Sequence, residues 1–120
     1  MRSLNEVTLE GNLGADPVAR TAKSGATWCT FALATNRARK EGNQWVEETQ
    51  WHEVKAFGRE AERAVGFKKG SAVRVTGRLE YEKWSDEHGQ ARKSPRIVCE
   101  SVALVPRPQA ESGAEVEAIA

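Results

Sequence analysis

The sequence predicts a mainly β protein built as a small closed barrel of five strands, and three observations predict it. Apolar and polar residues alternate with period two in five stretches of the 120-residue chain. Glycines interrupt two of these stretches, at Gly11 and Gly77, as strongly curled sheets require. Only residues 59–65 have a helical composition, and the length suits one domain.

The first two strands follow directly from this alternation. Val7 and Leu9 alternate with polar residues before the turn at Asp16-Pro17, and residues 18–23 allow a short extension. A second strand is expected over residues 26–36, with Cys29, Phe31 and Leu33 on one face and Trp28, Thr30, Ala32 and Ala34 on the other. For Trp28 we favour packing over ligand contact, because its strand neighbours are uncharged.

The third strand, over residues 48–59, has two unlike faces. His52, Val54 and Ala56 share one face, whereas Trp51, Glu53, Lys55 and Phe57 share the other. Large aromatic rings spaced with charges suit a surface that binds single-stranded nucleic acid, since every base can stack and every linker is anionic. The alternation alone is equally compatible with Trp51 and Phe57 in the core.

Between the second and third strands, residues 37–44 are expected to form a basic hairpin loop with Gly42-Asn43 at its tip, followed by Trp45. Two interpretations of its basic residues, among them Arg39, carry similar weight. They lie on a solvated loop, or they reach toward phosphate beside the aromatic face.

A short helix over residues 59–65 should stop at Gly66, and a fourth strand follows it. In that strand Val73, Val75 and Leu79 are expected to face inward, and Arg74, Thr76, Arg78 and Glu80 outward. Trp84 then precedes a polar hairpin tip at residues 85–90, where an aromatic residue is more typical of a contact surface than of a core. The fifth strand runs from residue 92 to residue 104.

Charge and composition exclude several classes of protein. The formal net charge is only +1, but residues 68–96 carry eight basic and four acidic side chains, so this half is expected to meet phosphate. No apolar run could serve as a signal sequence or a membrane span, which predicts a cytoplasmic protein without a membrane partner. Residues 1–106 are expected to form the domain, and residues 107–120 a disordered, mildly acidic tail.

Neither a metal site nor an active site is predicted. Cys29 and Cys99 lie far apart in the sequence and are interpreted as small buried residues, and two histidines do not complete a zinc site. The stretch from Lys68 to Ser71 lacks the glycine spacing of a phosphate-binding loop, and no nucleophile or paired-carboxylate motif appears. We therefore expect no cofactor and no enzymatic activity. A barrel that binds RNA or a protein partner is the alternative function.

Five strands, one short helix between strands 3 and 4, glycine bends and long hairpin loops together describe a five-stranded OB-fold barrel. Five segments, in this order, also resemble the bacterial single-stranded DNA-binding protein family. They are LEGNLGADP (9–17), FALATN (31–36), TQWHEVKAFG (49–58), KGSAVRVTGRL (69–79) and KWSD (83–86). The resemblance covers residues 4–105.

The resemblance implies sequence-independent binding and protection of single-stranded DNA during replication, recombination and repair, in association with the nucleoid. It implies a homotetramer in preference to a homodimer, with His52 at a subunit interface; without the resemblance, a partly buried, satisfied histidine would be preferred. The implied stacking residues are Trp51, Phe57 and Trp84, and the implied basic residues are Arg59, Lys69 and Lys83. Arg74 and Arg78 are added from the outward face of the fourth strand alone.

The sequence departs from the family pattern at three places. Arg39 stands where many members have another stacking tryptophan, so Arg39 itself or Trp45 is expected to fill that position. Glu6 replaces a basic residue, and the chain ends in EVEAIA instead of the family's linker and acidic tip. Because that tip recruits replication and repair enzymes in the family, the resemblance does not extend to recruitment.

Overall fold

The computed structural model describes residues 2–106, so the predicted tail lies outside the described residues. These residues form six strands and one helix. In chain order they are β1 (Val7–Leu13), β2 (Val18–Thr21), β3 (Thr27–Glu41), β4 (Gln44–Phe57), α1 (Gly58–Ala64), β5 (Ala72–Ser85) and β6 (Ala91–Leu104). No helix within this part of the chain is both long enough and apolar enough to span a membrane.

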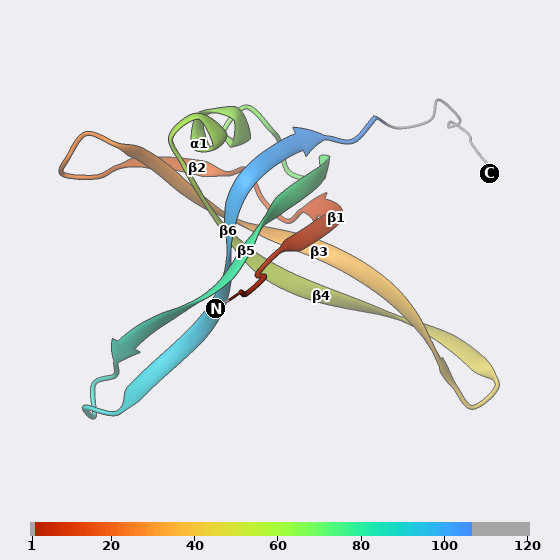
Figure 1. The fold of residues 1–120 in the computed structure, drawn as a ribbon. Coiled ribbons are helices and arrows are strands. Elements are labelled where there is room, and N and C mark those ends of the chain that lie inside the picture. The colour runs from red at the N-terminus through yellow and green to blue at the C-terminus, as the bar shows by residue number, and fades with distance from the viewer. Residues whose placement is uncertain (1, 107–120) are drawn as a thin grey trace.

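Five of the strands close into a barrel in the order β1-β5-β6-β4-β3 (Figure 1). The barrel closes because β1 changes partner: it pairs with β5 along most of its length, then with β3 through Asn12 opposite Ala34 and Leu13 opposite Leu33. The predicted mainly β, five-stranded OB-fold barrel is confirmed, with α1 between the third and fourth barrel strands. The short extension is β2, which pairs only with β3.

The hairpin loop predicted over residues 37–44 is wrong, because the two strands continue almost to the turn. Residues 37–41 pair with residues 44–48 as a regular antiparallel ladder, leaving only Gly42-Asn43 as the turn, and Gly42 adopts a φ of 62°. The polar tip predicted at residues 85–90 agrees with the structure, where β5 and β6 pair out to Ser85 and Ala91. Both ladders extend beyond the barrel as two-stranded arms (Figure 1). Backbone pairing maintains these strands where no core supplies an apolar pattern.

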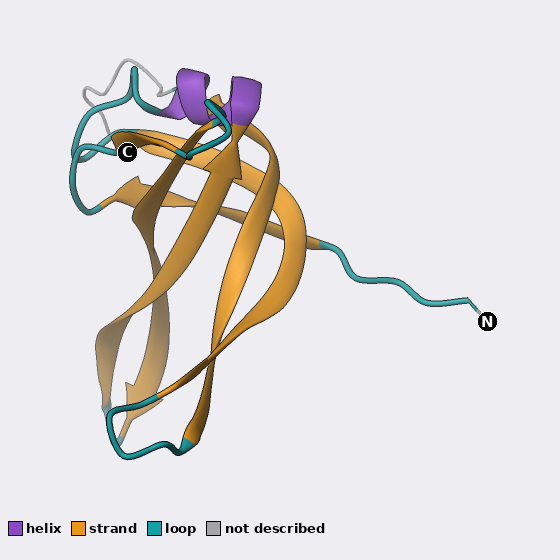
Figure 2. Cartoon of the chain, turned by 90° about the vertical axis from the view of Figure 1, so that its left-hand side faces the viewer, coloured by secondary structure: helices purple, strands orange, loops and turns teal. Residues whose placement is uncertain are grey.

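The core lies inside the barrel, and α1 covers one end of it (Figure 2). Leu33, Val54, Val73, Val75 and Val102 are fully buried, as is expected for alternate residues of strands that curl around one interior. The inward orientation predicted for Val54, Ala56, Val73 and Val75 is therefore confirmed. From α1 only Ala61 and Ala64 enter this interior, because small side chains let the helix approach the strand ends closely.

Both cysteines are buried and free, as predicted. Burial raises the pKa of Cys29, and burial together with the nearby charge of Glu60 raises the pKa of Cys99 to about 11. Because the thiolate is the reactive form, we expect both thiols to react with Ellman's reagent at pH 8 at least ~100-fold more slowly in the native protein than in guanidinium chloride. Rapid native reaction of either thiol would contradict this assignment.

Candidate nucleic-acid interface

The outward face of β4 presents the two aromatic residues that the alternation singled out. Trp51 is 61% exposed and Phe57 is 49% exposed, while Val54 and Ala56 between them face the core. A Cβ atom at Gly14 would lie 2.5 Å from Cζ3 of Trp51, so this glycine gives the indole room to lie against the backbone. Trp51 is thus supported on one side and open to solvent on another.

The neighbouring strand β3 leaves this face accessible. Ala34 lies directly opposite Trp51 in the ladder, and Ala32 lies opposite Glu53, so no large side chain of β3 stands beside Trp51. Opposite Phe57 lies Trp28, which is only partly buried and lies outside the core cluster. The packing role favoured for Trp28 is therefore not a role in the barrel core.

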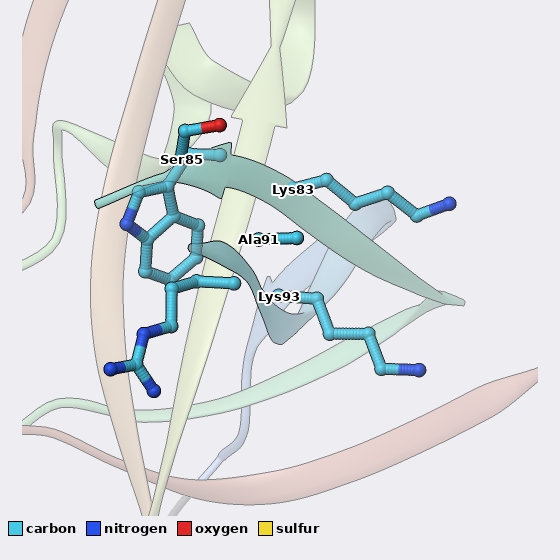
Figure 3. A pocket seen from close by; sticks show the side chains of 6 residues that line it. Lys83, Ser85, Ala91 and Lys93 are labelled. Carbon is cyan, nitrogen blue, oxygen red and sulfur yellow. The ribbon is translucent and has the colours of Figure 1, made fainter. Parts of the chain in front are cut away.

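Trp84 lies near the end of the β5–β6 arm and is 48% exposed. It pairs across the arm with Arg92, and Lys83 pairs with Lys93. In Figure 3, Lys83 and Lys93 extend from the two neighbouring strands of the arm. These four side chains border a shallow pocket that also contacts Ser85 and Ala91. Trp84 is therefore exposed, as its place near the tip indicated, and its contact with a ligand stays a prediction.

A cluster of ion pairs connects the face of β4 to the face of the β5–β6 arm. Strands β4 and β6 run parallel, with Lys55 opposite Val98. Lys55 Nζ lies 3.9 Å from Glu82, and the Arg96 guanidinium lies 3.5 Å from Glu53 and also contacts Glu82. The Nε of Arg96 is buried without a hydrogen-bond partner. The two basic and two acidic side chains of this cluster balance in charge. The region between the face of Trp51 and Phe57 and the arm of Trp84 is therefore nearly neutral.

The three basic residues implied by the resemblance are exposed, and within residues 2–106 none of them forms an ion pair with a carboxylate. Arg59 follows Phe57 by two residues, at the start of α1. Lys69 is held through its backbone, because its N–H donates to Asp16 Oδ1 at 2.6 Å, and its side chain stays exposed. Lys83 extends from the β5–β6 arm. Each of these cations is available to an anionic ligand.

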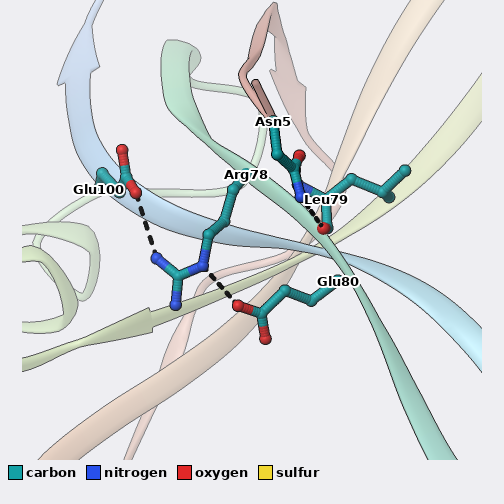
Figure 4. Close-up of polar contacts among 5 residues, drawn as sticks. All are labelled: Asn5, Arg78, Leu79, Glu80 and Glu100. Carbon is teal, nitrogen blue, oxygen red and sulfur yellow. Dashed lines mark hydrogen bonds and ion pairs between the residues drawn. The ribbon is translucent and has the colours of Figure 1, made fainter. Parts of the chain in front are cut away.

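The three other predicted basic residues, in contrast, are already paired with glutamates. Arg39 lies 3.0 Å from both Glu41 and Glu48, and Arg74 lies 2.8 Å from Glu10. Arg78 contacts Glu80 and lies 3.1 Å from Glu100 (Figure 4), and these hydrogen bonds raise its pKa above the ordinary value. Any phosphate that binds these arginines must compete with a carboxylate.

Strand parity separates the two candidates for the missing stacking position. Trp45, 69% exposed, lies on the same face of the β3–β4 arm as Trp51, whereas Arg39 lies on the opposite face, opposite Val46. His52 is half-buried on that opposite face, where Nε2 lies 2.8 Å from Thr35 Oγ1. A ligand that follows the Trp51 face therefore meets Trp45 and not Arg39.

Sequence reasoning missed Trp28 and Lys55 as a pair. Lys55 Nζ lies 4.7 Å from the ring centroid of Trp28 and 5.6 Å from that of Phe57. The alternation placed Trp28 on the face of its strand away from Cys29, and it placed Lys55 on the same face as Phe57. It did not predict the contact, because the register between the two strands was unknown. Within the described residues, no group of three His, Cys, Asp or Glu side chains could hold a metal ion.

The fold and these side chains define a class of protein: an OB-fold barrel that exposes large aromatic residues on β4 and on the β5–β6 arm, together with basic residues that form no ion pair within residues 2–106. The sequence matches the Single-strand binding protein family over residues 4–105. The chain belongs to that family.

Two relatives agree with this assignment, and a solved structure shares the fold. The chain is 43% identical over 117 residues to the single-stranded DNA-binding protein of Aquifex aeolicus, covering 96% of this chain and 77% of the relative. It is 38% identical over 107 residues to that of Xylella fastidiosa, covering 87% of this chain and 65% of the relative. The fold is similar to the Plasmodium falciparum SSB complex with ssDNA, with a TM-score of 0.78 and 24% identity, over 88% of this chain and 98% of the other.

Proposed function

We propose that this protein binds single-stranded DNA without strong sequence preference and protects it during replication, recombination and repair. The observation that supports this most is the exposure of three large aromatic residues, Trp51, Phe57 and Trp84, because grouped exposed rings mark an interaction surface and offer bases a stacking platform. Bases stack on the three rings, and each stacked base contributes about 1–3 kcal/mol. The protein acts by binding and not by catalysis, so sustained cleavage of an oligonucleotide would contradict the proposal.

The cations around these rings bind the phosphate backbone, and their ion-pair status ranks them. Arg59, Lys69 and Lys83 come first because no glutamate of residues 2–106 forms an ion pair with them. Arg39, Arg74 and Arg78 come second because a phosphate must displace a carboxylate. Trp45 is the preferred additional stacking residue, since it shares the face of Trp51.

The assembly that we propose is a homotetramer with His52 at a subunit interface, located in the cytoplasm with the nucleoid. Four copies would allow one strand to pass over several aromatic faces in succession. Native mass measurement with and without oligo-dT tests this, since it reports the number of subunits and the stoichiometry together. A monomer in both conditions would contradict the tetramer without affecting the binding proposal.

Intrinsic tryptophan fluorescence tests the binding proposal directly. Stacked bases quench indole emission, so oligo-dT should quench strongly and a duplex of the same length weakly. Comparable quenching by both would refute preference for single strands. Oligo-U run in parallel tests the alternative that the barrel serves RNA, and an absence of quenching by any nucleic acid would favour a protein partner.

Salt dependence tests the ranking of the cations. Lys83→Ala should make the slope of log K against log salt shallower by ~0.7, the value for one phosphate contact on a single strand. Arg78→Ala should change the slope by less than half as much, because Glu80 and Glu100 already hold its guanidinium. Fluorescence titrations with oligo-dT between 50 and 200 mM NaCl measure both slopes. Equal losses in the two variants would show that ion pairing does not rank these residues.

A further inference from the structure

A row of alternating cations and aromatic rings crosses β2, β3 and β4 on the outside of the barrel. Arg20 on β2 lies directly opposite Trp28 on β3, and Trp28 lies directly opposite Phe57 on β4. The guanidinium carbon of Arg20 lies 5.6 Å from the Trp28 ring centroid. Lys55 Nζ lies 4.7 Å from the same centroid and 5.6 Å from the centre of Phe57. These distances are within the range of cation–π attraction.

Trp28 is the residue of this row that both cations contact. Because β3 lies between β2 and β4, Arg20 and Lys55 approach the indole from two different neighbouring strands. A ring that is contacted in this way offers less free face to a base than Phe57 or Trp51 does. Its exposure agrees, since Trp28 is partly buried whereas Phe57 is exposed.

Arg20 keeps its charge available, whereas Lys55 forms one long ion pair with Glu82. Cation–π attraction orients a cation without adding a negative charge, unlike the glutamates that neutralise Arg39, Arg74 and Arg78. Within residues 2–106 Arg20 has no carboxylate at ion-pair distance. Among the described residues, only the carboxylate of Glu82 lies at ion-pair distance from Lys55, at 3.9 Å, and Arg96 contacts Glu82 more closely.

We propose that Arg20 and Lys55 form a phosphate-binding site that carries the DNA path from Phe57 across β3 to β2, and that Trp28 is the residue that positions both cations. This rests on the proposed binding of single-stranded DNA. The ligand is the phosphate backbone of a strand whose base stacks on Phe57. Strand β2 thereby becomes part of the binding surface. None of the DNA-binding residues implied by the resemblance lies on this strand.

A double-mutant cycle in the full chain tests the role of Trp28. Trp28→Leu should weaken oligo-dT binding at least ~3-fold in the wild-type background and less than 1.5-fold in the Arg20→Ala/Lys55→Ala background, because its effect runs through the two cations. A full effect in both backgrounds would overturn the proposal, since it would mean that Trp28 contacts bases itself or only supports the fold. Trp28→Phe, which keeps an aromatic ring, should bind oligo-dT like wild type. Binding as weak as that of Trp28→Leu would contradict the proposal that cation–π contacts position Arg20 and Lys55.

The salt slope tests the phosphate contact. Arg20→Ala should make the slope shallower by ~0.7, so that a fourfold increase in salt weakens wild type about 2.6-fold more than the variant. Arg20→Lys should keep the wild-type slope. A wild-type slope in Arg20→Ala would refute the site while leaving the general proposal intact. Failure of wild-type protein to bind oligo-dT would refute the general proposal itself.

Discussion

Trp51→Ala is expected to weaken binding of oligo-dT by roughly 5- to 150-fold, which corresponds to the loss of about 1–3 kcal/mol from one stacked base. The indole is 61% exposed, lies against Gly14, and has only Ala34 opposite it in the ladder. Most of its surface is therefore open to a base in the free protein. Its removal should cost little stability, about 1 kcal/mol or less, because it fills no space in the core.

The measurement pairs fluorescence or anisotropy titration with thermal unfolding. Leu104→Ala is the matched control, since Leu104 is a large apolar residue at the end of β6, opposite Val73 of β5, with a similar exposed fraction, 57%. This control should leave affinity within ~2-fold of wild type. If Trp51→Ala instead lowered the melting temperature strongly at unchanged affinity of the folded fraction, Trp51 would be a structural residue and the stacking assignment would be wrong.

Alternation alone predicted which residues of β4 share a face, and the family resemblance indicated that the face with Trp51 and Phe57 points outward. A one-residue shift would have moved Val54 and Ala56 into water, so the core fixed the orientation of Trp51 and Phe57 as well. The same logic succeeded in β5, where Val73 and Val75 face inward. Residues that share a strand with a buried partner thus carry their exposure in the sequence pattern.

The β3–β4 arm could not be predicted in this way. Residues 37–41 and 44–48 face solvent on both sides of the arm, so their sequence shows no apolar alternation. Their strand structure depends on the hydrogen-bonded backbone ladder. Partners that come from distant strands were also hidden. Glu10 neutralises Arg74 across 64 residues of sequence, and the Trp28–Lys55 contact depends on the register of β3 against β4. The alternation predicted which residues share a face of a strand. It did not predict which side chains of different strands contact one another.

Gly77→Ala is expected to destabilise the protein by about 3 kcal/mol or more, a fall of roughly 10–25 °C in melting temperature. Gly77 lies where the register of β5 against β6 shifts after Thr76, as the glycine in the strand pattern indicated. A Cβ atom there would lie 2.0 Å from the carbonyl oxygen of Val98. Because that atom belongs to the backbone of a paired strand, relief requires the two strands to separate.

Gly11→Ala should have a similar effect at the other closure point, since its Cβ would lie 2.1 Å from the carbonyl oxygen of Ala34, where β1 transfers from β5 to β3. Gly66→Ala is the control: its Cβ would meet nothing closer than the Arg63 carbonyl oxygen at 3.4 Å, so we expect a change within ~1 kcal/mol. Calorimetry of the three variants decides the matter. If Gly77→Ala and Gly66→Ala melted alike, close backbone approach would not be what closes this barrel, and the relative placement of Phe57 and Trp84 would need another cause.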